Sequence, residues 1–129
     1  MKRKQLTTSV ILIAALATVV SADEVSLAND LMPIFQRSCA GCHQRENGNP
    51  DAVKTGFLFD TKDGVLETVG KIIIKEQPEQ SYLLMVVTPP EDPNTDKKQM
   101  PPPRSKAPRL SKEEIQKISE WIKAGAKDN

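Results

Sequence analysis

The sequence predicts a small all-α domain, and three stretches with apolar residues at helical spacing carry that prediction. In the first, Leu31, Ile34 and Phe35 occupy positions i, i+3 and i+4 just before a pair of cysteines. The second stretch follows Pro78, and the third follows Ser111 near the C-terminus. Each stretch has an apolar side that can bury against the others, so we expect helix-on-helix packing.

The composition limits the chain to one small domain with a lean core. Of 129 residues, 38% are hydrophobic, and the aromatic residues are one Trp, one Tyr and three Phe. A core this lean is marginal unless a prosthetic group or another staple supports it.

The N-terminus has the pattern of a secretory signal peptide over residues 1–22, which leaves a single domain over 23–129. Lys2, Arg3 and Lys4 are basic, Val10 to Val20 is almost entirely apolar, and small residues precede a cleavage point expected after Ala22. The apolar run is too short to span a bilayer, although an uncleaved anchor stays open as an alternative. We therefore expect an exported, periplasmic protein that is not stably inserted in a membrane.

The charge of the processed chain argues against nucleic acid as a partner. Cleavage would remove three of the 18 basic residues and none of the 17 acidic ones, which leaves a net charge of −2. A nucleic-acid-binding domain would be expected to carry a net positive charge. We expect a monomer.

The first helix is expected to start at Asp30 as N-cap and to run to Arg37, with Pro33 in its first turn. An apolar side would then deliver Cys39 to the core. An earlier start, near Val25, stays open.

The middle of the chain is expected to alternate between loops and short elements. In order, these are a polar loop over 44–55, an apolar segment over 57–59, a capped turn over 60–64, a helical stretch from Val65 to Val69 that stops at Gly70, and an extended segment or buried wall over 72–74.

A second helix is expected after Pro78 and before Pro89. Its apolar stripe would consist of Tyr82, Leu83, Val86 and Val87. Seven of the ten prolines then fall between Thr88 and Pro108. Because only one helix follows, we interpret this stretch as a stiff loop folded back on the domain and not as a linker.

The last helix has the strongest local signals. Ser111 and Glu114 form a capping box, Leu110 precedes it as a staple residue, and Gly125 supplies the stop. Its apolar side consists of Ile115, Ile118, Trp121 and Ile122, and we expect Trp121 to be a core residue that packs against the first helix.

The segment Cys39-Ala40-Gly41-Cys42-His43 is a C-x-x-C-H motif, the signature of covalent c-type haem attachment. Its spacing puts both thiols on one side of a helical turn, where they can add to the two vinyl groups of one porphyrin. His43 would be the proximal iron ligand. Its other ring nitrogen would donate to a carbonyl of the following loop, with Pro50 or a neighbour as the candidate.

Two other uses of these cysteines are weaker. A thiol oxidoreductase would have its C-x-x-C between a strand and a helix, but no strand-like run precedes Cys39. A closed zinc site would need four ligands, whereas two cysteines and the one histidine supply three.

The candidate for the second iron ligand is Met100. The chain has no second histidine, and Met100 lies in Lys98-Gln99-Met100-Pro101-Pro102, where prolines lower the entropy lost in holding a weak thioether ligand. Met85 is the next candidate, and a surface position for Met100 is the alternative. Met32 lies almost beside the attachment turn.

Several blocks in order resemble a small class I cytochrome c, and in particular the planctomycete-type cytochrome c domain. These are C-A-G-C-H, F-L-F-D-T-K-D-G, E-Q-P-E-Q-S-Y-L-L, Q-M-P-P and L-S-K-E-E-I-Q-K-I-S-E-W-I-K-A-G-A. The resemblance implies N- and C-terminal helices packed around one covalently bound haem c. It also implies attachment at Cys39 and Cys42, with His43 and Met100 as iron ligands.

A His/Met-ligated iron has no open position for a substrate, so we expect a one-electron carrier and not an enzyme, with redox proteins as donor and acceptor. The alternatives are a cytochrome subunit of a larger periplasmic oxidoreductase, or a haem-based sensor or peroxidase with an open distal site. Basic residues around Met100 could dock acidic partners, although acidic residues nearby make a mixed solvated loop equally plausible. The basic residues are Lys97, Lys98, Arg104, Lys106 and Arg109, and the acidic ones are Glu91, Asp92 and Asp96.

Overall fold

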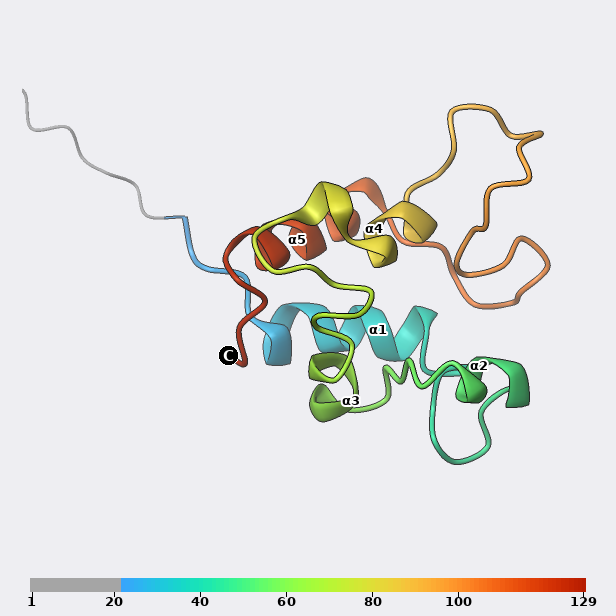
Figure 1. The fold of residues 1–129 in the computed structure, drawn as a ribbon, viewed down its shortest axis with the longest axis horizontal. Coiled ribbons are helices and arrows are strands. Elements are labelled where there is room, and N and C mark those ends of the chain that lie inside the picture. The colour runs from blue at the N-terminus through green and yellow to red at the C-terminus, as the bar shows by residue number, and fades with distance from the viewer. Residues whose placement is uncertain (1–21) are drawn as a thin grey trace, which may run out of the picture.

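The computed structural model describes residues 22–129, and in this range the protein is helical, with only an isolated bridge between Val69 and Ile73 (Figure 1). The all-α class is therefore confirmed for these residues. The expected signal peptide lies outside the described residues, apart from its last residue, Ala22. Between residues 22 and 129, every helix is too short or too polar to cross a membrane.

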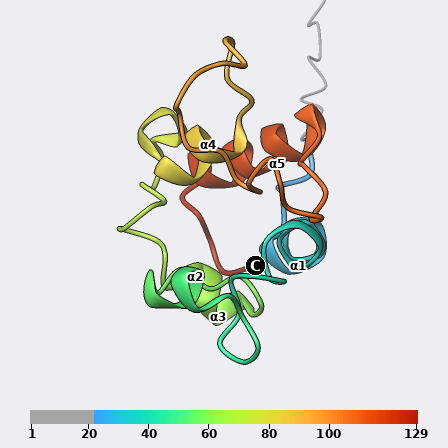
Figure 2. The same ribbon diagram turned by 90° about the vertical axis from the view of Figure 1, so that its right-hand side faces the viewer.

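Seven helical segments follow one another in the described range. They are the π-helical turn η1 (Leu27–Leu31), α1 (Met32–Ser38), α2 (Pro50–Lys54), α3 (Lys62–Leu66), the 3-10 turn η2 (Pro78–Gln80), α4 (Tyr82–Val87) and α5 (Lys112–Lys123). Figures 1 and 2 place α4 beside α5 on one side of the molecule and α2 and α3 on the other, while Figure 2 shows α1 to the side of α2 and α3.

The first helix begins earlier than the sequence predicts. Its N-cap is Ser26, whose hydroxyl accepts a hydrogen bond from the Asn29 N–H at 3.1 Å. Asp30, the expected N-cap, instead accepts a hydrogen bond from the Ser26 N–H at 2.8 Å. The two side chains form a capping box with one residue more than the usual spacing, which fits because a π-helical turn is one residue wider than an α-helical turn.

The predicted limits of the last helix are confirmed. The Ser111 hydroxyl accepts from the Glu114 N–H at 3.1 Å, and the Glu114 carboxylate accepts from the Ser111 N–H at 2.9 Å. The helix ends at Lys123, with Ala124 as C-cap followed by Gly125 with φ of 102°. A residue with a side chain is strained at such a positive φ, so glycine suits this position.

Two ion pairs join the C-terminal helix α5 to the N-terminal segment made of η1 and α1. The guanidinium of Arg37 donates to both oxygens of Glu114, at 2.7 and 2.8 Å. Lys117, one turn further along α5, lies 3.7 Å from the carboxylate of Asp30. These two ion pairs hold α5 alongside the η1–α1 segment.

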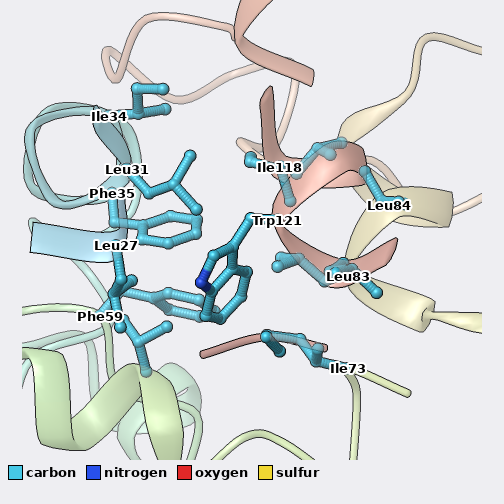
Figure 3. Packing of buried hydrophobic residues seen from close by; sticks show 14 of the residues in the cluster. Leu27, Leu31, Ile34, Phe35, Phe59, Ile73, Leu83, Leu84, Ile118 and Trp121 are labelled. Carbon is cyan, nitrogen blue, oxygen red and sulfur yellow. The ribbon is translucent and has the colours of Figure 1, made fainter. Parts of the chain in front are cut away.

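The core lies between these helices and centres on Trp121, as predicted. The Trp121 side chain lies between a group from η1 and α1 and a group from α4 and α5 (Figure 3). The indole N–H donates to the carbonyl of Lys127 at 2.9 Å, so its polar atom is satisfied although the residue is only 1% exposed. The largest fully buried side chains around it are Phe35, Leu27, Leu31, Ile73, Ile118 and Ile122.

Three of the predicted middle elements need correction. The loop expected over 44–55 contains α2, which begins with Asn49 as N-cap and Pro50 in its first turn. The helical stretch expected from Val65 to Val69 is α3, which lies three residues earlier. In α4, Leu84 is buried in place of Tyr82, which is 44% exposed.

The proline-rich stretch from Thr88 to Pro108 has no helix and forms the loop that projects beyond α4 in Figure 1. It returns to the body at Met100, whose N–H donates to the carbonyl of Val86 at 2.7 Å. The prediction of a loop folded back on the domain is therefore confirmed.

The two ends of the described chain are hydrogen-bonded to each other. Asn129 accepts from the N–H groups of Leu27 and Ala28, at 2.8 and 2.9 Å, and its side-chain amide donates to the carbonyl of Val25 at 3.1 Å. These bonds satisfy N–H groups at the start of η1 that have no partner within the helix.

Candidate functional site

The C-x-x-C-H segment forms a single turn that continues from the end of α1. Cys39 caps α1, and its carbonyl accepts hydrogen bonds from the N–H groups of Cys42 at 3.2 Å and His43 at 2.9 Å. Cys39 is half-buried, and Cys42 is exposed. The turn therefore keeps both thiols and the imidazole close together.

The imidazole of His43 is held by the segment that follows α2. Its Nδ1 lies 2.8 Å from the carbonyl oxygen of Phe57, and its ring meets the ring of Phe59 edge-on, with centroids 5.7 Å apart. The Phe59 N–H also donates to the His43 carbonyl at 2.8 Å. A proton on Nδ1 donated to Phe57 leaves Nε2 as the nitrogen able to bind a metal.

The expectation that Pro50 or a neighbouring loop residue supplies this carbonyl is wrong. Pro50 starts α2, and the chain then turns back so that Phe57 lies beside His43. This contact depends on how the whole loop folds, so local sequence signals could not identify it.

Gly48 belongs to the site, and sequence reasoning missed it. An added Cβ would lie 2.2 Å from the Gln44 carbonyl oxygen, 2.7 Å from the Cys42 carbonyl oxygen and 2.8 Å from a methyl group of Val53. The adjacent Asn49 N–H donates to the same Cys42 carbonyl at 2.9 Å. The loop thus closes directly on the attachment turn, in a space that only glycine fits.

One pocket, of about 300 Å³, brings the predicted site residues together. Cys39, Cys42 and His43 line one part of it, and Met100 lines another. Its volume is at the lower end of the range for small-molecule and cofactor sites. The proline-rich loop over residues 88–108 is called the Met100 loop below. The other lining residues include Leu83, Val86 and Val87 from α4, Pro101 and Pro102 from the Met100 loop, and Asn49, Ala52 and Thr55 around α2.

Both the main chain and the side chain of Met100 are held by contacts with the rest of the domain. Its N–H donates to the Val86 carbonyl at 2.7 Å, and its partly buried side chain packs against the hydrophobic core. The preceding residue, Gln99, accepts a hydrogen bond from Arg109 at 2.8 Å. A main-chain bond to α4 therefore positions Met100, in addition to the prolines that follow it.

The other two methionines of the described chain lie elsewhere. Met85, the next candidate, is 41% exposed and lines a separate groove on the other side of α4. Met32 is 7% exposed and belongs to the hydrophobic core. Neither lines the pocket that contains His43.

The two weaker readings of the cysteines find no support here. Burial raises the pKa of the Cys39 thiol to about 12, whereas the attacking cysteine of a thiol oxidoreductase needs a lowered pKa. A helix and not a strand leads into Cys39. Within residues 22–129, no three His, Cys, Asp or Glu side chains are grouped so that they could hold a metal ion, as a zinc site would require.

The residues around this pocket suit a covalently attached haem. Two thiols stand next to an imidazole with a free Nε2, and a thioether lines the same pocket. This is the donor set of a c-type haem with His and Met as iron ligands.

Comparison with known proteins gives one family. A model described as planctomycete cytochrome C matches residues 39–104, which includes the attachment turn, α2 to α4 and the Met100 loop. No curated protein and no solved structure matches the chain.

Proposed function

The chain belongs to the planctomycete cytochrome C family, and from that premise we propose that it carries one haem c and transfers single electrons between redox proteins. The observation that carries this proposal is the pocket shared by Cys39, Cys42, His43 and Met100. Residues from opposite ends of the matched region meet there, as a haem held from both faces requires.

Each residue has a distinct role in this proposal. Cys39 and Cys42 form thioether bonds, so the group stays attached even when iron–ligand bonds break. His43 binds iron through Nε2 while the Phe57 carbonyl fixes its ring. Met100 would bind iron through its sulfur, and the hydrogen bond from its N–H to the Val86 carbonyl positions its main chain.

When bound, haem supplies an iron that takes up and releases one electron, and a methionine ligand raises its reduction potential. The chain holds that group in a pocket walled by aliphatic side chains of α4 and by prolines of the Met100 loop. These walls make much of the pocket apolar, and two ligands held by the chain would limit rearrangement when the charge of the iron changes. These features suit an electron carrier better than an enzyme.

The cellular setting is part of the same proposal. Residues 1–22 would be a signal peptide cleaved after Ala22, and residues 23–129 an exported domain that works as a monomer in the periplasm. Its donor and acceptor would be redox proteins, with no nucleic acid and no stable membrane insertion.

The test is an optical spectrum of the exported, haem-loaded protein in both oxidation states. We expect covalent haem that withstands denaturation and is reduced in yield by Cys39→Ser or Cys42→Ser. In the ferric form we expect the weak far-red band of a sulfur-ligated iron, absent in Met100→Ala and retained in the matched control Met85→Ala.

Other outcomes would change the assignment. Loss of the band in Met85→Ala alone would make Met85 the ligand. A missing band together with rapid binding of carbon monoxide to the ferrous protein would favour an open-site sensor or peroxidase. Purification with a stable stoichiometric partner would favour an oxidoreductase subunit.

A further inference from the structure

Two adjacent lysines in the Met100 loop face different hollows of the molecule. Lys98 lines the pocket that contains His43 and Met100. Lys97 lines the groove on the other side of α4, together with Met85 and others. The two lysines therefore lie next to each other in the chain but line separate cavities.

Lys98 is the one cationic side chain among the residues that line the site pocket, and Asp51 is the one carboxylate. Asp51 points largely to solvent, because its side chain is 93% exposed, and it lies 3.6 Å from Lys54. Within residues 22–129, Lys98 forms no ion pair with a protein carboxylate. The pocket therefore has an uncompensated positive charge beside the expected methionine ligand.

A haem has two propionate groups, so the group expected in this pocket is itself anionic. We propose that Lys98 pairs with a haem carboxylate and thereby raises the reduction potential of the iron. A positive charge near the iron disfavours the ferric state, which has one positive charge more than the ferrous state. This inference rests on the proposed function, and it assigns Lys98 as a residue that tunes the reduction potential of the iron.

The effect is expected to be modest, because Lys98 is exposed and water screens its charge. Two unit charges about 10 Å apart change an equilibrium constant by about twofold in bulk water and by about fifteenfold near a protein surface, so we expect about threefold to tenfold once salt screens the pair. Lys97 carries the same charge but lines the groove beyond α4, so we expect it to act on the iron from farther away and to change the equilibrium constant less.

The experiment compares three variants of the full-length, haem-loaded protein by spectroelectrochemical titration at low and high salt. Lys98→Gln should lower the equilibrium constant for reduction by about threefold to tenfold at low salt, and less at high salt. Lys98→Arg keeps the charge and should stay within about twofold of the original protein. Lys97→Gln, the matched control, should also stay within about twofold.

The inference is overturned if Lys97→Gln changes the equilibrium constant for reduction as much as Lys98→Gln does. The net charge of the protein, and not the position of Lys98, would then explain the change. Failure of Lys98→Arg to restore the value would also overturn it, because shape and not charge would be responsible. Haem staining and the far-red band are recorded for each variant. If Lys98→Gln keeps the far-red band and its equilibrium constant for reduction does not change, only the role of Lys98 is refuted. Absence of haem or of the band in the original protein instead refutes the proposed function.

Discussion

Gly48 offers a sharp test of how the attachment turn is built. Gly48→Ala would place a methyl group 2.2 Å from the Gln44 carbonyl oxygen and 2.7 Å from the Cys42 carbonyl oxygen. Both contacts are with backbone, so no side-chain rotation can relieve them. The main chain of the attachment turn must move, and with it the position of Cys42.

The size of the effect follows from two opposing contributions. Forcing an extra methyl group into a packed site typically costs about 1 to 3 kcal/mol, and two backbone clashes favour the upper end. Replacing glycine with alanine restricts the unfolded chain, which offsets about 0.4 to 1 kcal/mol. We expect Gly48→Ala to lower the free energy of unfolding by about 2 kcal/mol.

The matched control is Gly41→Ala, within the same motif. A Cβ added at Gly41 meets no protein atom within 4 Å, and its φ is outside the left-handed region. Guanidinium unfolding of the haem-loaded proteins, followed by Soret absorbance, measures both variants, and haem staining measures the attached fraction. We expect a clear loss of stability and of attached haem for Gly48→Ala and an unchanged unfolding midpoint for Gly41→Ala, whose Cβ would meet no protein atom.

An unfolding midpoint of Gly48→Ala equal to that of the original protein would refute this reasoning. It would mean that the loop over residues 44–49 yields freely, so the turn is not held by its close approach to Cys42. An equal loss in Gly41→Ala and Gly48→Ala would instead show that any added methyl group in this region is harmful.

Two further changes test the framework around the site. Arg37 holds the pKa of Glu114 below its usual value, so the ion pair stabilises the protein fully above a pH of about 4.3 and loses its effect as the pH falls through the lowered value. Glu114→Gln should therefore cost about 0.5 to 1 kcal/mol at pH 7 in denaturant unfolding, and a difference that persists at low pH would contradict this cause. Ser81→Ala should cost about 1 to 3 kcal/mol by the same assay, because the fully buried hydroxyl accepts from the Ile74 N–H at 2.9 Å. Ser119→Ala, which removes a hydroxyl from α5, is the control, and equal losses at both serines would argue against a special role for Ser81.

Local signals were enough to predict the last helix, and the predicted site residues Cys39, Cys42, His43 and Met100 line one pocket. The capping box of Ser111 and Glu114 depends on residues three apart, so spacing in the sequence is spacing in space. Met100 and not Met85 lines the pocket that contains His43, and its role as iron ligand stays a prediction. Prolines follow Met100, but its hydrogen bond to Val86, a contact across the chain, also positions it.

The predictions that the structure corrects concern turns that depart from a regular α-helix and contacts between segments distant in the sequence. Asp30 was misplaced as N-cap because a π-helical turn adds one residue between it and Ser26. The Asn-Pro start of α2 is a helix signal, but the polar residues and glycine around it favour a loop. The carbonyl that faces His43 belongs to Phe57, 14 residues away, and only the complete loop brings it there.

The hydrogen bonds between Asn129 and the residues around Leu27 fix where the domain can be held. Figure 1 places both ends of the described chain at the left of the molecule, while the attachment turn, α2 and the Met100 loop lie at the right. A partner fused to either end is therefore attached to the same side of the domain, away from the pocket. A surface-immobilised or fused form should therefore leave the side with the attachment turn, α2 and the Met100 loop accessible.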